Sequence, residues 1–238
     1  MDAAEALLRS AVRAGVEVCF ANPGTTEMGL VRALDEVPEM RAVLGLFEGV
    51  CTGAADGYGR MRGHPALTLL HLGPGLANGL ANLHNARRAH APVVNLVGDH
   101  ASWHLAADAP LTSDIESLAR PVSGWFHHAR DAGTAPRDLV EAVAAAVSAP
   151  GAVATLVLPT DVQEGAASPC EPMTSQPPAA VSADRLASAR EALSAEGTAL
   201  LLGSSALTEV GLAAAGRIAA ATGARLIAET FSARAERG

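Results

Sequence analysis

The stretch that most constrains the fold runs from Ala42 to Arg60, where a short apolar run gives way to small residues. The apolar run ends at Phe47 and is followed by one carboxylate, Glu48, and then by a segment rich in glycine and alanine. Such a boundary is typical of a buried strand that leads into a helix. The small residues would let that helix lie close to a neighbouring backbone or to a ligand.

Glu48 has two interpretations on the residue pattern alone. It could be structural, either by capping the helix that follows or by pairing with Arg60 or Arg62. It could instead be functional, because a carboxylate at the end of a buried strand is costly unless something at that place needs it. The pattern leaves both interpretations open.

Segments with strand and helix patterns alternate along residues 1–158. We expect strands at 16–20, 42–47, 67–72, 93–97, 122–126 and 152–158, and helices at 3–14, 27–36, 49–61, 76–89 and 136–148. This alternation predicts an α/β fold with a parallel sheet of about six strands and helices on both faces. Residues 99–121 lack clear periodicity, which predicts a functional or interface loop.

Five prolines lie between residues 159 and 182, which indicates a linker. The α/β pattern restarts after it, with helices expected at 184–194 and 207–221 and strands at 198–202 and 224–228. Four such elements bury little surface and rarely form a domain alone. We therefore expect a domain at 1–165, a linker at 166–183, and a truncated second α/β unit at 184–238.

Composition narrows the class of protein and its compartment. The net charge of −8 over 238 residues gives no basic footprint for nucleic acid. No apolar run approaches the roughly 20 residues that a membrane span requires. Cys19, Cys51 and Cys170 are widely spaced, which argues against a disulfide framework. These features predict a cytoplasmic protein without nucleic-acid or membrane partners.

Three segments carry a family resemblance when they are taken in order: FANPGTTE at 20–27, LFEGVCTGAADGYGRMRGHPA at 46–66, and LLHLGPGLANGLANLHNARRAHAPVVNLVGD at 69–99. Together they resemble the pyrimidine-binding (PYR) domain of thiamine-diphosphate-dependent enzymes. The superfamily includes acetolactate synthase, pyruvate oxidase and benzoylformate decarboxylase. The resemblance covers residues 1–165 and implies the thiamine-diphosphate-binding (PYR) fold.

The resemblance implies thiamine diphosphate as cofactor and assigns roles to particular residues. Glu48 would hydrogen-bond the pyrimidine ring, and His71 would face the reactive carbon as a proton donor or acceptor. Thr25 would hydrogen-bond the substrate carboxylate, with His71 also near the substrate. The other predicted cofactor contacts are Asn22, Pro23, Gly24, Gly73, Gly75 and Asn78. From the residues alone, a lone histidine in a strand is more often structural.

The implied function is that of the N-terminal portion of a 2-oxo acid carboligase or decarboxylase. The stretch from His71 to Ala89 favours an acetolactate synthase-like protein, whereas His71 with the segment 22–27 favours a benzoylformate decarboxylase-like one. A rival of another class is a non-catalytic fragment or binding module. The implied partners are a small 2-oxo acid and further copies of the chain, which form a homodimer or tetramer through helices 49–61 and 76–89.

The resemblance places the Mg²⁺ that holds the diphosphate on another domain, in a Gly-Asp-Gly motif followed by an asparagine. Here Gly98-Asp99 is followed by His100 and lies in the first domain. We therefore predict no metal ligand in this chain and a Mg²⁺ site outside it. FAD is possible as a further cofactor, although no residue here supports it.

Other patterns are weaker. Residues 73–79 miss the dinucleotide-binding fingerprint by one position. His100 and His104 have the spacing of a zinc pair but lack the glutamate that follows the first histidine, and His127-His128 is expected at a strand edge. Ser204-Ser205 lacks the complete G-x-S-x-G pattern of a nucleophile elbow.

Overall fold

The structure is a computed structural model that describes residues 1–173 and 179–236. The chain divides into two compact units, residues 1–175 and 176–238. Residues 174–178 of the predicted linker and residues 237–238 lie outside the described residues.

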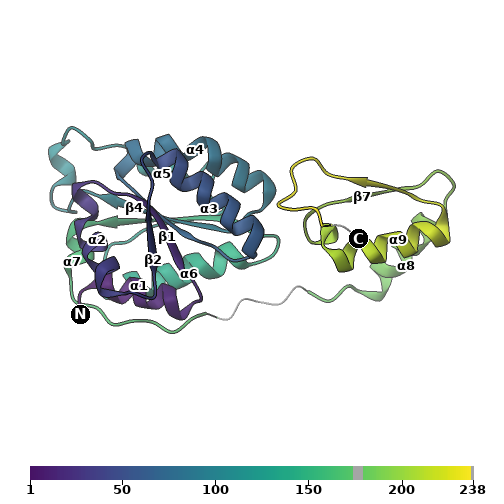
Figure 1. The fold of residues 1–238 in the computed structure, drawn as a ribbon, viewed down its shortest axis with the longest axis horizontal. Helices are drawn as coiled ribbons and strands as arrows, with labels where there is room; N and C mark the ends of the chain where they lie inside the picture. Colours follow the sequence, from purple (N-terminus) through teal and green to yellow (C-terminus); the bar gives the residue numbers. More distant parts are fainter. Residues whose placement is uncertain (174–178, 237–238) are drawn as a thin grey trace. The chain divides into compact units, whose positions relative to one another are not determined.

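A parallel sheet of six strands forms the centre of the first unit (Figure 1). Its strands are β1 Val18–Asn22, β2 Arg41–Leu44, β3 Leu67–Leu70, β4 Val93–Asp99, β5 Trp125–His128 and β6 Val153–Pro159. Their order across the sheet is β2-β1-β3-β4-β6-β5, and all neighbouring pairs are parallel. The predicted α/β class and six-stranded parallel sheet are confirmed.

Helices cover both faces of this sheet, as predicted (Figure 1). They are α1 Ala3–Arg13, α2 Met28–Glu36, α3 Glu48–Arg62, α4 Leu72–Ala89, α5 Ile115–Ala119, α6 Ala135–Val147 and α7 Thr160–Glu164. On one face α3 packs against α4, with α5 beside α4; on the other face α1 packs against α6 and α2. The first unit is therefore a three-layer sandwich of helices, sheet and helices.

The core lies along the central strands, whose sequences are almost continuously apolar. Every residue of β3, β4 and β6 is buried, as expected for parallel strands covered on both faces. Three buried polar side chains cross these strands as a chain of hydrogen bonds. Thr68 Oγ1 donates to Asn95 Oδ1 at 2.8 Å, and Asn95 Nδ2 donates to Thr155 Oγ1 at 3.0 Å. These bonds satisfy groups that would otherwise be costly to bury.

Two predicted strands are displaced along the chain. The strand expected at 16–20 is β1 at 18–22, because the Val16 N–H bonds the Ala11 carbonyl and so belongs to the exit from α1. The strand expected at 122–126 is β5 at 125–128. There the N–H groups of Val122 and Ser123 bond the Ala119 carbonyl at the end of α5.

The strand before Glu48 was expected to be buried, and this prediction is wrong. β2 is an edge strand that ends at Leu44, and three of its four residues are exposed. Leu44 is 70% exposed and Leu46, just beyond it, is 91% exposed. An apolar run therefore marks an uncovered surface here rather than the core.

The expected loop at 99–121 contains two short helical segments, the 3₁₀ turn Leu105–Ala107 and α5. The second unit consists of α8 Ala183–Leu193, β7 Ala199–Leu202, a 3₁₀ turn Ser204–Leu207, α9 Glu209–Thr222 and β8 Arg225–Ala228. Its two strands pair in parallel, and its elements lie within two residues of the predicted bounds. Within the part of the chain that the structure describes, no helix is both long enough and apolar enough to span a bilayer.

Candidate functional site

Three of the predicted site residues lie where the chain leaves neighbouring strands. Asn22 is the last residue of β1, His71 directly follows β3, and Glu48 lies just beyond β2. Parallel strands place their carboxyl ends at one edge of the sheet, which is where open α/β sheets bind ligands. The order β2-β1-β3 therefore brings these three junctions side by side.

Glu48 is the first residue of α3 and is only 9% exposed. Its Oε2 accepts a hydrogen bond from Asn78 Nδ2 of α4 at 2.9 Å. Gly75 lies against the same carboxylate, since a Cβ there would stand 3.0 Å from Glu48 Oε1. The predicted residues Glu48, Gly75 and Asn78 are thus brought together across the α3–α4 pair.

Neither of the two structural roles considered for Glu48 is seen in this geometry. Its side chain bonds Asn78, and no side-chain hydrogen bond caps α3. The two arginines considered as partners have carboxylates of their own. Arg60 pairs with Asp56 at 2.8 Å, and Arg62 pairs with Glu17 at 3.2 Å.

His71 is the N-cap residue of α4 and follows β3, whereas the strand expected at 67–72 would have included it. The Gly73-Pro74-Gly75 segment is the first turn of α4 and not a separate turn, since the Gly75 N–H donates to the His71 carbonyl at 2.8 Å. Leu72 between them has a φ of 53°, a left-handed conformation that is strained for leucine. Such strain is often found at functional sites.

The carboxylate of Glu27 holds the His71 ring, a contact that sequence reasoning missed. Glu27 Oε2 lies 2.8 Å from His71 Nδ1, and the Glu27 side chain is fully buried. The same carboxylate accepts hydrogen bonds from the Gly24 N–H at 2.7 Å and from Thr26 Oγ1 at 2.6 Å. Its signal in the sequence was its place as the last residue of FANPGTTE.

The remaining residues of the FANPGTTE segment have distinct positions. Gly24 packs directly on His71, because a Cβ there would stand 2.4 Å from Nδ1 of the ring. Thr25, the predicted substrate contact, is exposed, whereas the buried Thr26 has its Oγ1 3.3 Å from His71 Nδ1. The half-buried Pro23 follows Asn22, whose Nδ2 donates to the Gly45 carbonyl at 2.8 Å.

Gly73 lies against Ser113 and Leu118 rather than against Glu48 or His71. A Cβ at Gly73 would stand 2.0 Å from Ser113 Oγ, so this glycine instead lets the segment before α5 approach the start of α4. Its predicted role as a cofactor contact stays a prediction.

A third buried carboxylate, Asp99, lies at the end of β4 near Glu27. Burial raises the pKa of Asp99, while the His100 N–H that donates to it at 2.8 Å and the nearby His128 act in the opposite direction. His128 Nε2 lies 3.5 Å from Asp99 Oδ2, and burial lowers the pKa of this histidine. Glu27 adds to the raised pKa of Asp99.

The weaker sequence patterns do not assemble into sites. The rings of His100 and His104 lie 5.8 Å apart edge to face, and no group of three or more metal-ligating side chains occurs within residues 1–173 and 179–236. His127 and His128 lie in β5, an edge strand, as expected.

Comparison with known proteins identifies relatives of this chain. Residues 1–121 match the family of thiamine pyrophosphate enzymes, at the N-terminal TPP binding domain. A Mycobacterium tuberculosis relative with the provisional name acetolactate synthase large subunit IlvX is 51% identical over 240 residues, covering all of this chain and 46% of the relative. The benzoylformate decarboxylase of Pseudomonas aeruginosa is 34% identical over 150 residues, which are 63% of this chain and 28% of that enzyme.

Among solved structures, the thiamine diphosphate-dependent 4-hydroxybenzoylformate decarboxylase of Rhodococcus jostii is similar to this chain. The TM-score is 0.85 at 25% identity, covering 96% of this chain and 44% of that one. The chain therefore belongs to the thiamine pyrophosphate enzyme family, with the N-terminal TPP binding domain in its first unit. It spans less than half the length of each of these three proteins.

Proposed function

We propose that the first unit is the pyrimidine-binding half of a thiamine-diphosphate-dependent 2-oxo acid enzyme of the acetolactate synthase type. The observation that carries the proposal is the carboxylate of Glu48, nearly buried at the start of α3 and oriented by Asn78 at 2.9 Å. When bound, the cofactor supplies a nucleophilic carbon through which a 2-oxo acid can lose CO₂.

The residues around Glu48 fit the pyrimidine ring of that cofactor. Asn78 occupies Oε2, and no hydrogen bond from the described residues occupies Oε1, which leaves that oxygen for a ring nitrogen. Gly49 and Gly75 lie beside the carboxylate in the α3 and α4 turns. A Cβ at Gly49 would stand 2.5 Å from the Phe47 ring and one at Gly75 would stand 3.0 Å from Glu48 Oε1, so both glycines let these side chains lie against the first turns of the helices.

His71 is suited to hold or move a proton near the substrate. Glu27 engages Nδ1, so the neutral ring carries its proton there and leaves Nε2 as the basic nitrogen. Gly24 packs on the ring and Thr26 Oγ1 lies 3.3 Å from Nδ1, so both residues restrict the orientation of the ring. Thr25 remains the predicted contact for the substrate carboxylate, and its exposure leaves it accessible to a ligand.

Two outcomes of the reaction are compatible with this site. The relative that is 51% identical over the whole chain carries an acetolactate synthase name, which supports carboligation as the first choice. The second candidate is a benzoylformate decarboxylase-like enzyme, favoured by the His71–Glu27 pair together with the 34% identity to the Pseudomonas aeruginosa protein. The alternative from another functional class is that the chain is a non-catalytic fragment or binding module.

The remaining cofactor proposals name a group without assigning residues of this chain to it. We place the diphosphate and its Mg²⁺ outside this chain, as the family resemblance implies. FAD has no residue here to which we can assign it. Cys19, Cys51 and Cys170 are free thiols, which is compatible with the predicted cytoplasmic location.

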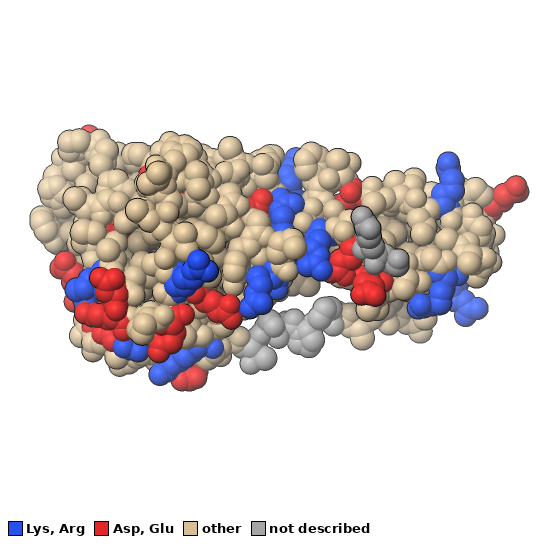
Figure 2. Space-filling model, in the orientation of Figure 1, with Lys and Arg blue, Asp and Glu red and all other residues tan. Residues whose placement is uncertain are grey.

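Association between copies of the chain is supported by the surface beside Glu48. Large apolar side chains are exposed where β2 leads into α3, namely Leu44, Leu46, Phe47 and Val50. Figure 2 shows that charged side chains gather on the α1 and α2 side of the first unit, whereas the surface over α4 and α5 is nearly free of them. Exposed apolar patches of this kind mark protein interfaces.

Calorimetric titration with thiamine diphosphate and Mg²⁺ tests the role of Glu48. We expect weak binding by the 238-residue chain and its loss in Glu48→Gln, which keeps the size of the side chain and removes its charge. Glu39→Gln, at an exposed position, is the matched control and should bind as the parent does. Equal binding by Glu48→Gln and the parent would contradict the proposal.

Catalytic activity is tested in a full-length protein that contains this chain and also carries a diphosphate site. There Glu48→Gln should lower turnover of pyruvate or benzoylformate by at least about 100-fold, as for other removed acid–base groups. The product distinguishes carboligation from simple decarboxylation. Near-parental turnover in Glu48→Gln would also contradict the assignment.

A further inference from the structure

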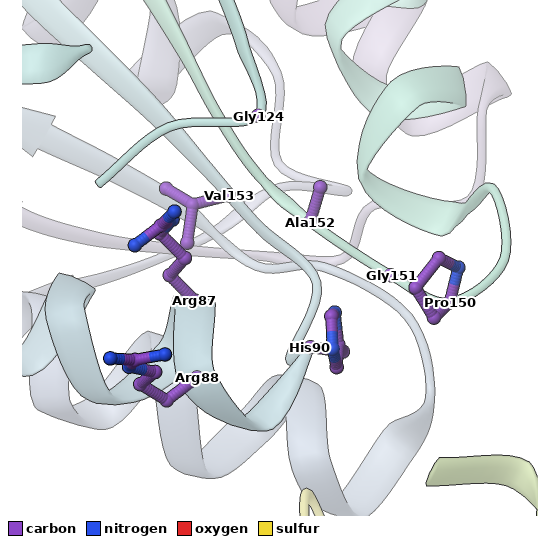
Figure 3. Close-up of a pocket in the computed structure, with 8 residues that line it drawn as sticks. All are labelled: Arg87, Arg88, His90, Gly124, Pro150, Gly151, Ala152 and Val153. Atoms are coloured by element: carbon purple, nitrogen blue, oxygen red, sulfur yellow. The ribbon is translucent and has the colours of Figure 1, made fainter. Parts of the chain in front are cut away.

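A cavity of about 350 Å³ opens at the amino edge of the sheet, at the opposite end of the strands from Glu48 and His71 (Figure 3). It lies between the end of α4, the residue before β5 and the segment that leads into β6. Its lining residues are Arg87, Arg88, His90, Gly124, Pro150, Gly151, Ala152 and Val153. The volume is within the range that small-molecule sites occupy.

The charge of this cavity is one-sided. Arg87, Arg88 and His90 contribute three nitrogen-bearing side chains, and no carboxylate is among the lining residues. Neither arginine has an ion pair within the part of the chain that the structure describes, in contrast to Arg60 on the adjacent α3, which pairs with Asp56. The cavity is thus a local positive site in a chain whose net charge is −8.

The opposite wall is built from backbone that is held in place. Gly151 has a φ of 105°, and a Cβ there would stand 2.1 Å from the His90 carbonyl oxygen. This glycine therefore allows the segment before β6 to meet the end of α4. The Gly124 N–H donates to the Val153 carbonyl at 2.8 Å and fixes the second side. In Figure 3 the Arg87 side chain extends from α4 toward Val153, with Arg88 beside it on the same helix.

Basic side chains in the last turn of a helix also have a purely structural explanation, because they complement the negative end of the helix dipole. That effect accounts for positive charge at the end of α4. It requires neither a cavity in front of the charges nor a rigid wall facing them. The charges here face a cavity and a rigid backbone wall, and no carboxylate is among the lining residues. Together these features point to an anionic ligand.

We propose that the Arg87–His90 pocket, formed by the eight lining residues above, binds a small molecule that carries a phosphate group. The planar guanidinium fork of arginine matches phosphate oxygens in a bidentate manner, and two adjacent forks can engage one phosphate or diphosphate group. His90, the C-cap residue of α4, supplies a further donor to the lining. Pro150 and Val153 offer apolar surface to the remainder of the molecule.

Isothermal titration of the 238-residue chain with inorganic phosphate, ADP and adenosine tests this proposal. We expect saturable binding of ADP below about 1 mM, no binding of adenosine, and phosphate binding that shows whether the anion alone suffices. The Arg87→Gln/Arg88→Gln variant should weaken ADP binding by at least about tenfold. Arg130→Gln is the matched control, since Arg130 is exposed at the carboxyl end of β5.

The outcomes separate this pocket from the proposed thiamine diphosphate site. Glu48→Gln should leave ADP binding unchanged, because it lies at the other edge of the sheet. Circular dichroism confirms that each variant is folded. Equal binding of ADP and adenosine, unchanged ADP affinity in the double variant, or no binding of phosphate and ADP at about 1 mM would overturn the proposal.

Discussion

Glu27 Oε2 lies 2.8 Å from His71 Nδ1, and the two residues come from different strand ends of the sheet. The Glu27 carboxylate is fully buried and accepts further hydrogen bonds from Gly24 and Thr26. A buried charge of this kind is tolerated only with such partners. The pair therefore links the orientation of the histidine to the local fold of the FANPGTTE segment.

Replacement of Glu27 by alanine should destabilise the first unit by about 3 kcal/mol. The change removes a buried carboxylate and leaves the Gly24 N–H and the His71 ring without their acceptor. Urea unfolding of the 238-residue chain measures the effect. Glu39→Ala, at an exposed position, should change stability by no more than about 0.5 kcal/mol. Similar stability of both variants would show that the pair contributes nothing to the fold.

Gly24→Ala should displace the His71 ring, because the new Cβ would stand 2.4 Å from Nδ1. We expect a loss of about 1–3 kcal/mol, typical of overpacking at a buried contact. NMR signals of the His71 imidazole should shift in this variant. Unchanged signals together with parental stability would mean that the ring is not held against this glycine.

Two glycines of α3 offer a matched comparison. Gly57 has open space where a Cβ would stand, so Gly57→Ala should stabilise the protein by about 0.5–1 kcal/mol through helix propensity. A Cβ at Gly59 would stand 2.3 Å from the Pro92 carbonyl oxygen, so Gly59→Ala should be destabilising by about 1–3 kcal/mol. Chemical denaturation gives both values. Changes of the same sign would contradict the packing described for this helix.

Asp99 provides a prediction about pH. Burial raises its pKa above the ordinary 3.8, so its charged form costs folding free energy once the pH rises above that value. Asp99→Asn keeps the oxygen that accepts from the His100 N–H. The variant should therefore be more stable than the parent at pH 7, with the difference shrinking as the pH falls toward 3.8. A difference that grows on acidification would contradict this sign.

Self-association should depend on the apolar side chains near Glu48. Leu46 is 91% exposed, and Leu46→Glu places a charge within that patch. We expect a lower average mass for the variant in sedimentation experiments. Val210→Glu, at an 80% exposed position of α9, is the control. A monomeric parent, or equal masses for both variants, would argue against association through this surface.

The order of strands and helices could be predicted from the sequence because the central strands are apolar and flanked by turn residues. The edge strands were harder. β5 includes His127 and His128, polar residues that an exposed edge allows and that an apolar pattern cannot detect. β2 shows the opposite problem, since Leu44 is apolar yet exposed. Periodicity reports which residues are apolar and not whether another surface covers them.

The site was predictable only in part. Glu48, Gly75 and Asn78 were named from the resemblance, and the structure gathers them around one carboxylate. The contact between Glu27 and His71 joins residues 44 positions apart and depends on the neighbouring positions of β1 and β3. Glutamate side chains are usually exposed, so the residue type gave no sign that Glu27 would be buried.

Gln163 of α7 connects the end of the first unit to the segment that carries Glu27. Its Nε2 donates to the Thr26 carbonyl at 2.9 Å and to the Leu158 carbonyl at 2.8 Å. During synthesis on a ribosome, residues 20–71 emerge long before α7, and domains fold as their parts become available. The surroundings of His71 are therefore completed only when residue 163 has left the exit tunnel. A nascent chain stalled earlier should expose this region to proteases.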